Sequence, residues 1–549
     1  MEFEFDEDQR LLQQMVRETV AKSRSLPAEQ LWTTYLDLGW LEAPAVELAI
    51  VLEELGYVAD PTPFLATATW FAPLAGRLPA GSGTGVCDGT GRFVLDADRA
   101  DEIALVTRDG VVIASGPELN AERVATFDPT LHVAHVNAPD LVPGIPDLAL
   151  MGLAISTVGS CRRILDLAVA HVKFRAEFSA FLDAHLPSEA EATPRPRSSS
   201  DMPEWAGRWQ RALFDAGWLL PGNPPEYGGR NATLPQQLAY LEELSERRIY
   251  HSFNPQGLGI IAASILTFGT QQQKQRWAVP ILRAEITASL GMSEPGAGSD
   301  LAGLRTRAVL DGDYFVVNGQ KVWTSGAHDA DVLLTFVRTD PDAPKHKGIS
   351  VLLIPTGTEG VASRPFASIA GPDDLDFNEV FFTDVRVPRE NLIGQLNQGW
   401  TVAHGSLGHE RTLLWLSFAE RLGDLIRDAP SHQEWYATLL MDAQALRLLG
   451  YRQLSAAKGG GDRHPAELSV LKLLGSEAVQ AASLHALEEQ GPAGLVHPAV
   501  TGPYNHMNND AFIASWFERY VRSFAGTIAG GTSEIQRNII AERILGLPR

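Results

Sequence analysis

The sequence predicts an α+β chain, mainly helical, in which an α, β, α order is repeated in part. Helical periodicity surrounds two regions rich in strand-forming residues, and 549 residues exceed one ordinary core. Short segments also recur in the same order along the chain. The repeated pairs are Asp37–Leu41 with Asp215–Leu219, Leu52–Leu55 with Leu241–Leu244, and Phe127–Pro139 with Phe377–Pro388. We therefore expect a partial duplication.

The first copy is expected to be truncated and to cover residues 1–182. It has a helical start, then a β section rich in Gly, Val and Thr, and then one long amphipathic helix. These elements are predicted at Gln9–Lys22, Glu47–Gly56, Gly85–Val136 and Leu148–Phe178. Residues 183–203 are rich in Pro, Ser, Glu and Arg, a composition that buries little apolar surface, and they predict a linker.

The second copy is expected to be complete. Its helical domain is predicted at 204–287, its β domain at 288–388 and its final helices at 389–549. Within the β domain, Asp311-Gly312-Asp313 is typical of a hairpin turn. Periodicity alone supports only the α, β, α order.

Composition excludes several classes of function. A formal net charge of −22 gives no electrostatic support for binding nucleic acid or an anionic membrane surface. The two cysteines, Cys87 and Cys161, have no metal-ligand spacing, and no uninterrupted apolar run reaches membrane-spanning length. Acidic residues fill the N-terminus where a secretory signal needs positive charge, so we expect a cytoplasmic protein. From the charge, the apolar runs and the cysteine spacing we expect that it binds no membrane and no metal.

Four segments carry the functional signal. The run Leu290–Asp300 combines glycines with Ser293 and Ser299, so its backbone can approach a flat or phosphorylated ligand, although a plain turn between strands has the same composition. Three further segments follow it in order: Asn318–Gly326, Phe377–Pro388 and Ala529–Asn538. This ordered set resembles the acyl-CoA dehydrogenase superfamily, from about Trp209 to Arg549.

The resemblance implies a fold and a reaction. The fold would consist of an N-terminal helical domain, a middle β-barrel and a C-terminal four-helix bundle. The reaction would be the FAD-dependent α,β-dehydrogenation of an acyl-CoA thioester in lipid metabolism such as β-oxidation. An electron-transferring flavoprotein would accept the electrons. A carboxylate would remove the α proton, which requires a dry site and donors that polarise the thioester carbonyl.

Glu410 is the candidate base. Many family members place the base just before the Gly-Thr of the C-terminal motif, where this chain has Gly530. A second subgroup places it early in the C-terminal bundle, and the matching stretch here ends in His409-Glu410-Arg411. The alternative is a solvated glutamate on an amphipathic helix.

Gly530 has two implied roles. Its backbone N–H, together with a flavin ribityl hydroxyl, would bind the thioester oxygen, and its missing side chain would leave room for a branched or bulky, sterol-side-chain-like substrate. A plain turn glycine with positive φ is compatible with both roles.

The other site residues follow from the same resemblance. Met292 and Ser293 would touch the isoalloxazine edge, and Trp323 and Ser325 would cover another part of it. The remaining contacts would be Thr532 and Glu534 at the nucleotide part of FAD and Ser299 in the substrate channel. Trp323 could instead be ordinary core, and Glu534 an ordinary first-turn acid of a helix.

Arg175 is a further candidate. The second copy lacks the Arg-x-x-Phe-Gly segment through which family members reach a neighbouring subunit's FAD, whereas Lys173–Ser179 preserves Arg and Phe. We therefore expect the first copy to be non-catalytic and to offer Arg175 to the FAD of the second copy or of another chain. Arg175 could also simply solvate an amphipathic helix.

Two other functions stay open at this level. One is a non-catalytic scaffold subunit of a hetero-oligomeric dehydrogenase, and the other is an acyl-CoA oxidase or flavin monooxygenase of the same fold. The acyl group and its carrier, CoA or an acyl carrier protein, are not fixed by the sequence. We expect a homo-oligomer, a dimer of pseudo-dimeric chains.

Overall fold

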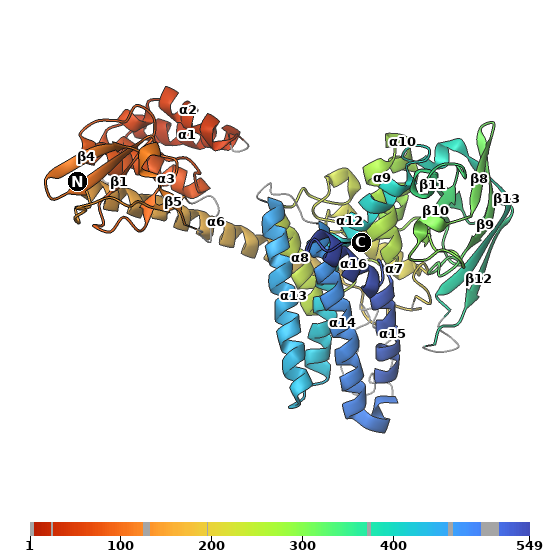
Figure 1. The fold of residues 1–549 in the computed structure, drawn as a ribbon. Helices are drawn as coiled ribbons and strands as arrows, with labels where there is room; N and C mark the ends of the chain where they lie inside the picture. Colours follow the sequence, from red (N-terminus) through yellow and green to blue (C-terminus); the bar gives the residue numbers. More distant parts are fainter. Residues whose placement is uncertain are drawn as a thin grey trace. The chain divides into compact units, whose positions relative to one another are not determined.

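The computed structural model describes residues 5–23, 26–124, 132–194, 196–369, 375–458, 465–495 and 515–548. Side chains at 404–417, 420, 454–458 and 465–466 lie outside this description. The chain divides into two compact units, Met1–Lys173 and Phe174–Arg549 (Figure 1).

The first unit begins with short helices around an apolar core. The buried residues of this core include Val16, Tyr35, Trp40, Val51 and Phe64. The helical elements are α1 (Glu7–Ser23), α2 (Ala28–Asp37), η1 (Trp40–Glu42), α3 (Ala45–Val58), α4 (Phe64–Ala66), η2 (Thr67–Phe71) and α5 (Ala72–Ala75).

Two small sheets and a long helix complete the first unit. One sheet has the order β1 (Gly83–Val86), β3 (Glu102–Thr107), β4 (Gly110–Ser115), and the other has the order β2 (Val94–Leu95), β6 (Val133–His135), β5 (Glu122–Arg123). The short helix η3 (Pro117–Leu119) lies between β4 and β5 in sequence. The long helix α6 (Asp147–His185) follows, close to its predicted position.

The boundary between the two units falls inside α6, nine residues before the predicted end of the first copy at residue 182. The reason is packing: Phe174, Phe178 and Leu182 are buried in the second unit's core, together with Trp209 and Trp218. Phe174 meets the Trp218 ring edge-on, with ring centroids 5.1 Å apart. The last turns of α6 are therefore part of the second unit.

The second unit opens with helices ahead of its sheet. Helix α8 is held at its start by a capping box between Thr233 and Gln236, which satisfies backbone groups that a helix end leaves unpaired. The helical elements are α7 (Glu204–Asp215), η4 (Pro225–Tyr227), α8 (Leu234–Arg247), η5 (Gly257–Ala262), α9 (Ala263–Phe268), α10 (Gln271–Gln273), η6 (Lys274–Ala278) and α11 (Val279–Leu282).

An eight-stranded sheet follows, with the order β12-β13-β9-β8-β10-β11-β14 and with β7 paired in parallel to β10. The predicted hairpin is confirmed, since β8 and β9 pair antiparallel from Asp311 and Tyr314 around Gly312 at φ 59°. The strands are β7 (Ala288–Gly291), β8 (Arg307–Asp311), β9 (Tyr314–Lys321), β10 (Val332–Arg338), β11 (Ile349–Pro355), β12 (Val361–Phe366), β13 (Phe377–Pro388) and β14 (Leu392–Ile393). The short helices η7 (Leu301–Gly303), η8 (Lys345–Lys347) and η9 (Arg389–Asn391) lie in its loops.

Long helices end the chain and run side by side in Figure 1. They share an apolar core that includes Phe418, Leu422, Leu446, Leu471 and Trp516. The elements are α12 (Gly399–Asp428), α13 (Glu434–Lys458), α14 (Pro465–Gln490), η10 (Gly491–Leu495), α15 (Trp516–Ile528) and α16 (Ser533–Arg543). The N-terminal helical, middle β and C-terminal helical order is as predicted.

The repeated sequence pairs have the same local geometry in both units. Helices α2 and α7 each lead into a left-handed glycine, Gly39 at φ 69° and Gly217 at φ 71°, and each glycine is followed by a buried tryptophan. Helices α3 and α8 both have 14 residues and both end at a residue with φ 53°. Matching turns at matching positions favour the predicted duplication.

Within the described residues, α6 is long and apolar enough to cross a membrane by length and composition, and 17% of its most apolar window is buried. The helix meets the criterion by its mean hydropathy, while Arg162 and Arg163 interrupt any continuous apolar run. Core helices of soluble proteins pass the same test, so the property is weak evidence for a membrane. The absence of a membrane partner and the cytoplasmic location stay predictions.

Candidate functional site

Two of the predicted segments lie side by side at one end of the sheet. Strand β7 leads into Met292 and Ser293, and strand β9 leads through Lys321 into the turn from Val322 to Ser325. The Val322 N–H donates to the Ser293 carbonyl at 3.0 Å, and the Lys321 Nζ donates to the Met292 carbonyl at 3.1 Å. The structure thus brings together Met292, Ser293, Trp323 and Ser325.

A buried ion pair joins these two segments. Lys321 Nζ lies 2.8 Å from Glu294 Oε1, and the side chains are 0% and 7% exposed. Glu294 also accepts backbone N–H bonds from Arg305 at 2.6 Å and Thr306 at 2.8 Å. Charge-assisted bonds of this kind fix the direction of both loops.

The ion pair shifts the pKa values of both partners. Burial acts to raise the pKa of Glu294, but the charge of Lys321 and the hydrogen bonds to the carboxylate outweigh it and hold this pKa below its ordinary value. Burial lowers the pKa of Lys321 to about 8, against the charge of Glu294. Neither residue was predicted as part of the site. The sequence feature that could have indicated Lys321 is its position: it ends a strand of alternating buried and exposed residues, on the buried side.

Trp323 lies on the surface of the turn and not in the core. Its side chain is 59% exposed and its backbone has φ 61°, a left-handed conformation that is uncommon for any residue with a bulky side chain. Phe366 and Phe377 meet its ring edge-on, with centroids 5.2 and 5.6 Å away. The alternative of an ordinary core tryptophan is wrong. An exposed aromatic platform held in a strained turn is typical of a ligand site.

Hydroxyl groups around the turn have unused hydrogen-bonding capacity. The Thr324 Oγ1 is buried and has no partner within the described part of the chain, and an unpaired buried polar atom requires an explanation. The hydroxyls of Ser293 and Ser325 flank it on the two loops and are likewise without a protein hydrogen bond among the described residues. A flat ligand with ring nitrogens and carbonyls, such as an isoalloxazine, fits this set of donors and the exposed Trp323 ring.

A second group of predicted residues forms the start of α16. Gly530 has φ 68°, and a Cβ built on it would meet no atom within 4 Å. Thr532 caps the helix by accepting the Ile535 N–H at 3.3 Å. Glu534 lies in the first turn, exposed, with Arg537 3.6 Å away, as the first-turn alternative anticipates. A helix N-terminus also suits the phosphates of a nucleotide, so the predicted contacts of Thr532 and Glu534 stay predictions.

Two other predicted residues stand apart. Ser299 is exposed in the loop after Glu294. Glu410 lies in α12 (Gly399–Asp428), within the predicted final helices, and its side chain is outside the described residues. The roles of Ser299 and Glu410 therefore stay predictions.

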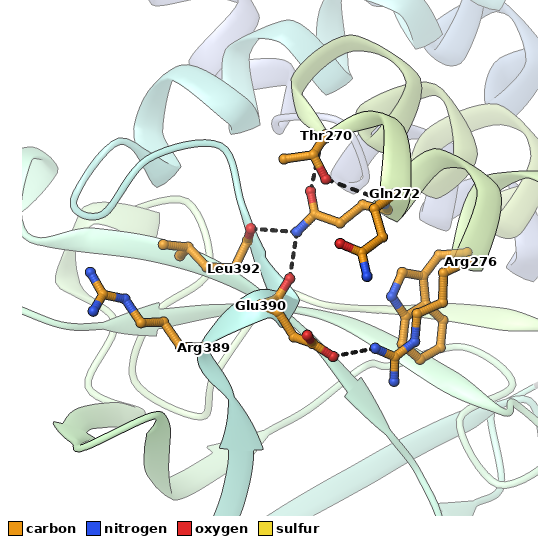
Figure 2. A pocket seen from close by; sticks show the side chains of 8 residues that line it. Thr270, Gln272, Arg276, Arg389, Glu390 and Leu392 are labelled. Atoms are coloured by element: carbon orange, nitrogen blue, oxygen red, sulfur yellow. Dashed lines mark hydrogen bonds and ion pairs between the residues drawn. The ribbon is translucent and has the colours of Figure 1, made fainter.

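A pocket of about 250 Å³ lies elsewhere, between the helices and the sheet of the second unit. Its lining residues are Thr270, Gln272, Gln273, Arg276, Trp277, Arg389, Glu390 and Leu392 (Figure 2). Gln273 Nε2 donates to the carbonyls of Glu390 at 2.7 Å and Leu392 at 2.8 Å, and Arg276 pairs with Glu390. These contacts tie the helices to the sheet, and no predicted site residue lines the pocket. We interpret this pocket as part of the packing between the helices and the sheet, and not as a ligand site.

Comparisons with known proteins place all three domains. Residues 169–285, 289–385 and 397–545 match the N-terminal, middle and C-terminal domains of acyl-CoA dehydrogenases. The chain is similar to acyl-CoA dehydrogenase IpdE1 of Mycobacterium tuberculosis (strain ATCC 25618 / H37Rv), with 34% identity over 389 residues that cover 69% of this chain and 98% of the relative.

Two solved structures have a similar fold, in agreement with these domain matches. A structure described as the Tcur3481-Tcur3483 steroid ACAD has a TM-score of 0.56 and 28% identity, over 70% of this chain and 98% of that chain. The ChsE4-ChsE5 complex from Mycobacterium tuberculosis has a TM-score of 0.55 and 31% identity, over 69% of this chain and 98% of that chain.

The N-terminal match starts at residue 169 and includes Arg175, which we predicted at the end of the first copy. The second compact unit also starts before it, at Phe174. Arg175 Nε donates to Glu243 at 2.7 Å, and its other end pairs with Glu246, both on α8. The structure thus assigns Arg175 to the first helix of the second copy, and its ion pairs favour a role on the helix surface over the predicted FAD contact.

We expect Arg175→Ala to lower the free energy of unfolding by about 1–2 kcal/mol, because it removes the bonds to Glu243 and Glu246. The affinity for FAD should not change. Titration of flavin-free protein with FAD measures this directly. A tenfold weaker affinity in the variant would instead support the predicted contact.

Proposed function

Because this chain belongs to the acyl-CoA dehydrogenase family, whose members are FAD-dependent flavoproteins, we propose that it oxidises the bond between the α and β carbons of an acyl-CoA thioester. The observation that carries the proposal is the turn at Trp323. An exposed indole at φ 61° is followed by the buried Thr324 hydroxyl, which has no partner among the described residues, on a turn held by a buried ion pair.

Each part of the chain contributes a separate chemical task. Bound FAD would accept the β hydrogen as hydride. Glu410, in the first helix of the C-terminal bundle, takes the α proton. The N–H of Gly530 orients and polarises the thioester carbonyl, which makes the α proton more acidic.

We propose a branched or bulky acyl group, similar to a sterol side chain, as the substrate. Gly530 supports this because the space beside it is open: a Cβ there would meet nothing within 4 Å. The steroid ACAD named in a related structure points the same way. An electron-transferring flavoprotein is the proposed electron acceptor, and a homo-oligomer is the proposed assembly.

We expect purified protein to be reduced faster by steroidal or branched CoA thioesters than by straight-chain ones, by at least about tenfold in kcat/KM. Anaerobic stopped-flow measurement of flavin bleaching with a matched set of thioesters tests this. A clear preference for short straight chains would contradict the proposed substrate class while leaving dehydrogenation intact. Reoxidation of the reduced protein in air, if rapid, would favour the oxidase alternative.

A further inference from the structure

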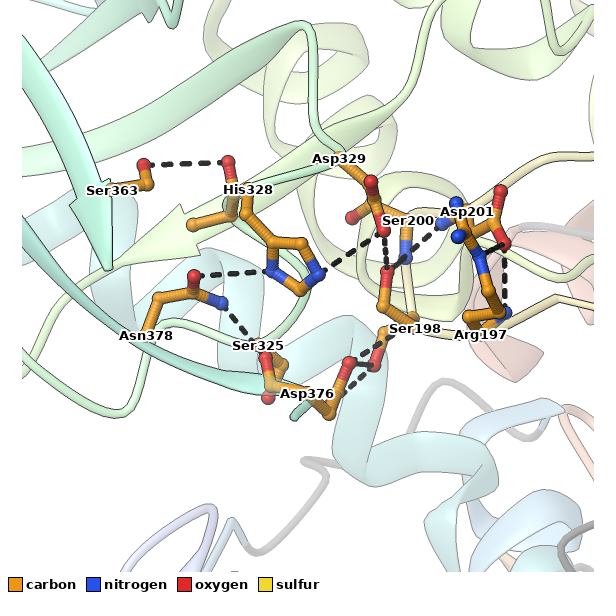
Figure 3. A network of polar contacts seen from close by, with 12 residues as sticks. Arg197, Ser198, Ser200, Asp201, Ser325, His328, Asp329, Ser363, Asp376 and Asn378 are labelled. Carbon is orange, nitrogen blue, oxygen red and sulfur yellow. Dashed lines mark hydrogen bonds and ion pairs between the residues drawn. The ribbon is translucent and has the colours of Figure 1, made fainter. Parts of the chain in front are cut away.

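The segment Arg197–Asp201, predicted as part of a linker, packs against the turn that runs from Ser325 to Asp329 (Figure 3). Ser198 and Ser200 are 4% and 2% exposed, so the segment is built into the second unit. It continues into α7 and belongs to the same compact unit as the sheet. A flexible spacer would leave these serines in water.

One arm of contacts runs from this segment through His328 to the turn. Ser198 Oγ donates to Asp329 Oδ2 at 2.8 Å, and the same oxygen lies 3.2 Å from His328 Nε2. His328 Nδ1 lies 3.1 Å from Asn378 Oδ1. Asn378 Nδ2 then donates to the carbonyl of Thr324 at 3.1 Å.

A second arm returns to the segment through Asp376. Asn378 Nδ2 also donates to the Asp376 carbonyl at 2.9 Å, and that carbonyl accepts the Gly326 N–H at 2.7 Å. The Asp376 carboxylate accepts the Ser199 N–H at 2.7 Å and its hydroxyl. The two arms start and end on the same run of serines, so the contacts form a closed circuit.

The circuit bonds the backbone of Thr324 and Gly326, in a turn that contains two left-handed residues. Trp323 has φ 61° and Gly326 has φ 67°, and a side chain at Gly326 would meet Ser200 Oγ at 2.6 Å. Such conformations persist only where the surroundings impose them. Asn254 connects the segment to strand β7, since its Nδ2 donates to the carbonyls of Ser199 at 2.8 Å and Ala288 at 3.0 Å.

We propose that the circuit of Ser198, Asp329, His328 and Asn378 positions Trp323 and Thr324 for flavin binding, and that the segment between the two sequence copies is thereby part of the cofactor site. His328 is a positioning residue in this proposal, since it contacts Asn378 and Asp329 and acts through them. The inference rests on the proposed function because it assumes that FAD lies against the turn. Family resemblance did not predict it, since Ser198, His328 and Asp329 lie outside the four motifs.

The test compares full-length variants by FAD dissociation constant and by the visible spectrum of the bound flavin. His328→Leu breaks both ring contacts, and His328→Asn keeps an N–H for Asn378. Ser198→Ala breaks the bond to Asp329 and the two bonds that its hydroxyl accepts from the N–H groups of Ser200 and Asp201. Ser363→Ala is the matched control, because Ser363 lies beside the same turn and its hydroxyl makes only a long bond, at 3.5 Å to the Ala327 carbonyl, within the described part of the chain.

We expect His328→Leu to weaken FAD binding about tenfold or more and to shift the flavin bands, and Ser198→Ala to weaken it by about threefold to tenfold. His328→Asn should recover most of the affinity, and Ser363→Ala should match the wild type. If His328→Leu does not fold, Ser198→Ala and His328→Asn carry the comparison.

Failure of the positioning role and failure of the proposed function would give different results. Wild-type FAD affinity and spectrum in Ser198→Ala, and in His328→Leu where it folds, would overturn the positioning role even if their thermal stability fell, and would leave the proposed function standing. A wild-type protein that binds no FAD would overturn the proposed function, and this inference with it.

Discussion

Glu410→Gln is expected to slow reduction of the bound flavin by substrate by about 10²–10⁴-fold, the range that one general base contributes. The amide is nearly the same size as the carboxylate but cannot accept the α proton. Flavin content and the affinity for the thioester should stay close to wild type, since neither depends on that charge. Anaerobic stopped-flow mixing with a branched CoA thioester measures the rate.

The control for this variant is Glu434→Gln, which makes the same change on an exposed glutamate at the start of α13. It should be reduced at the wild-type rate. Normal reduction of the flavin in Glu410→Gln would remove Glu410 as the base.

Lys321→Met is expected to destabilise the sheet by about 3–5 kcal/mol, because it leaves a buried carboxylate without its cation. Glu294 keeps the backbone N–H bonds from Arg305 and Thr306 but loses the partner 2.8 Å away. The loops that carry Ser293 and Trp323 would then separate, so FAD affinity should fall as well. Urea unfolding and FAD titration measure the two effects.

The pair Lys321→Met, Glu294→Gln provides the internal test. Removing both charges should recover a large part of the lost stability, since the cost lies in the unpaired charge. Arg386→Ala is the surface control, because Arg386 and its partner Asp311 are 54% and 65% exposed, and it should cost less than about 1 kcal/mol. Equal losses for Arg386→Ala and Lys321→Met would contradict the structural role of the buried pair.

The stability supplied by Glu294 should also depend on pH. Its pKa is lower in the folded protein than the ordinary value of about 4, so its contribution is present above that value and is lost as the pH falls through the folded-state pKa. Lys321→Met should therefore reduce the loss of stability on acidification.

The parts of the site that the sequence predicted are those with local chemical signals. The segments around Ser293 and Trp323 contain glycines and hydroxyls in a recognisable order, and the structure places them side by side. The turns at Gly39 and Gly217 were likewise visible as repeated Asp-x-Gly-Trp segments. The conformation of such turns depends on residues that are neighbours in the chain, so a short stretch of sequence is enough to predict it.

The features that could not be predicted from the sequence depend on contacts between residues far apart in the chain. Lysine is rarely fully buried, so nothing local marks Lys321 as the partner of Glu294, 27 positions earlier. The composition of 183–203 favours a linker, yet Ser198 and Ser199 bond Asp329 and Asp376, 131 and 177 positions away. The unit boundary near Arg175 also differs from the predicted one because of distant contacts, since the packing of Phe174 and Phe178 decides to which unit that helix end belongs.

The most direct measurement of the central claim is the visible spectrum of the purified full-length protein during anaerobic titration with an acyl-CoA thioester. We predict a yellow protein whose flavin band bleaches as the enoyl product forms, with one flavin per chain. A colourless protein that gains no flavin when FAD is added, or a bound flavin that no thioester reduces, would contradict it.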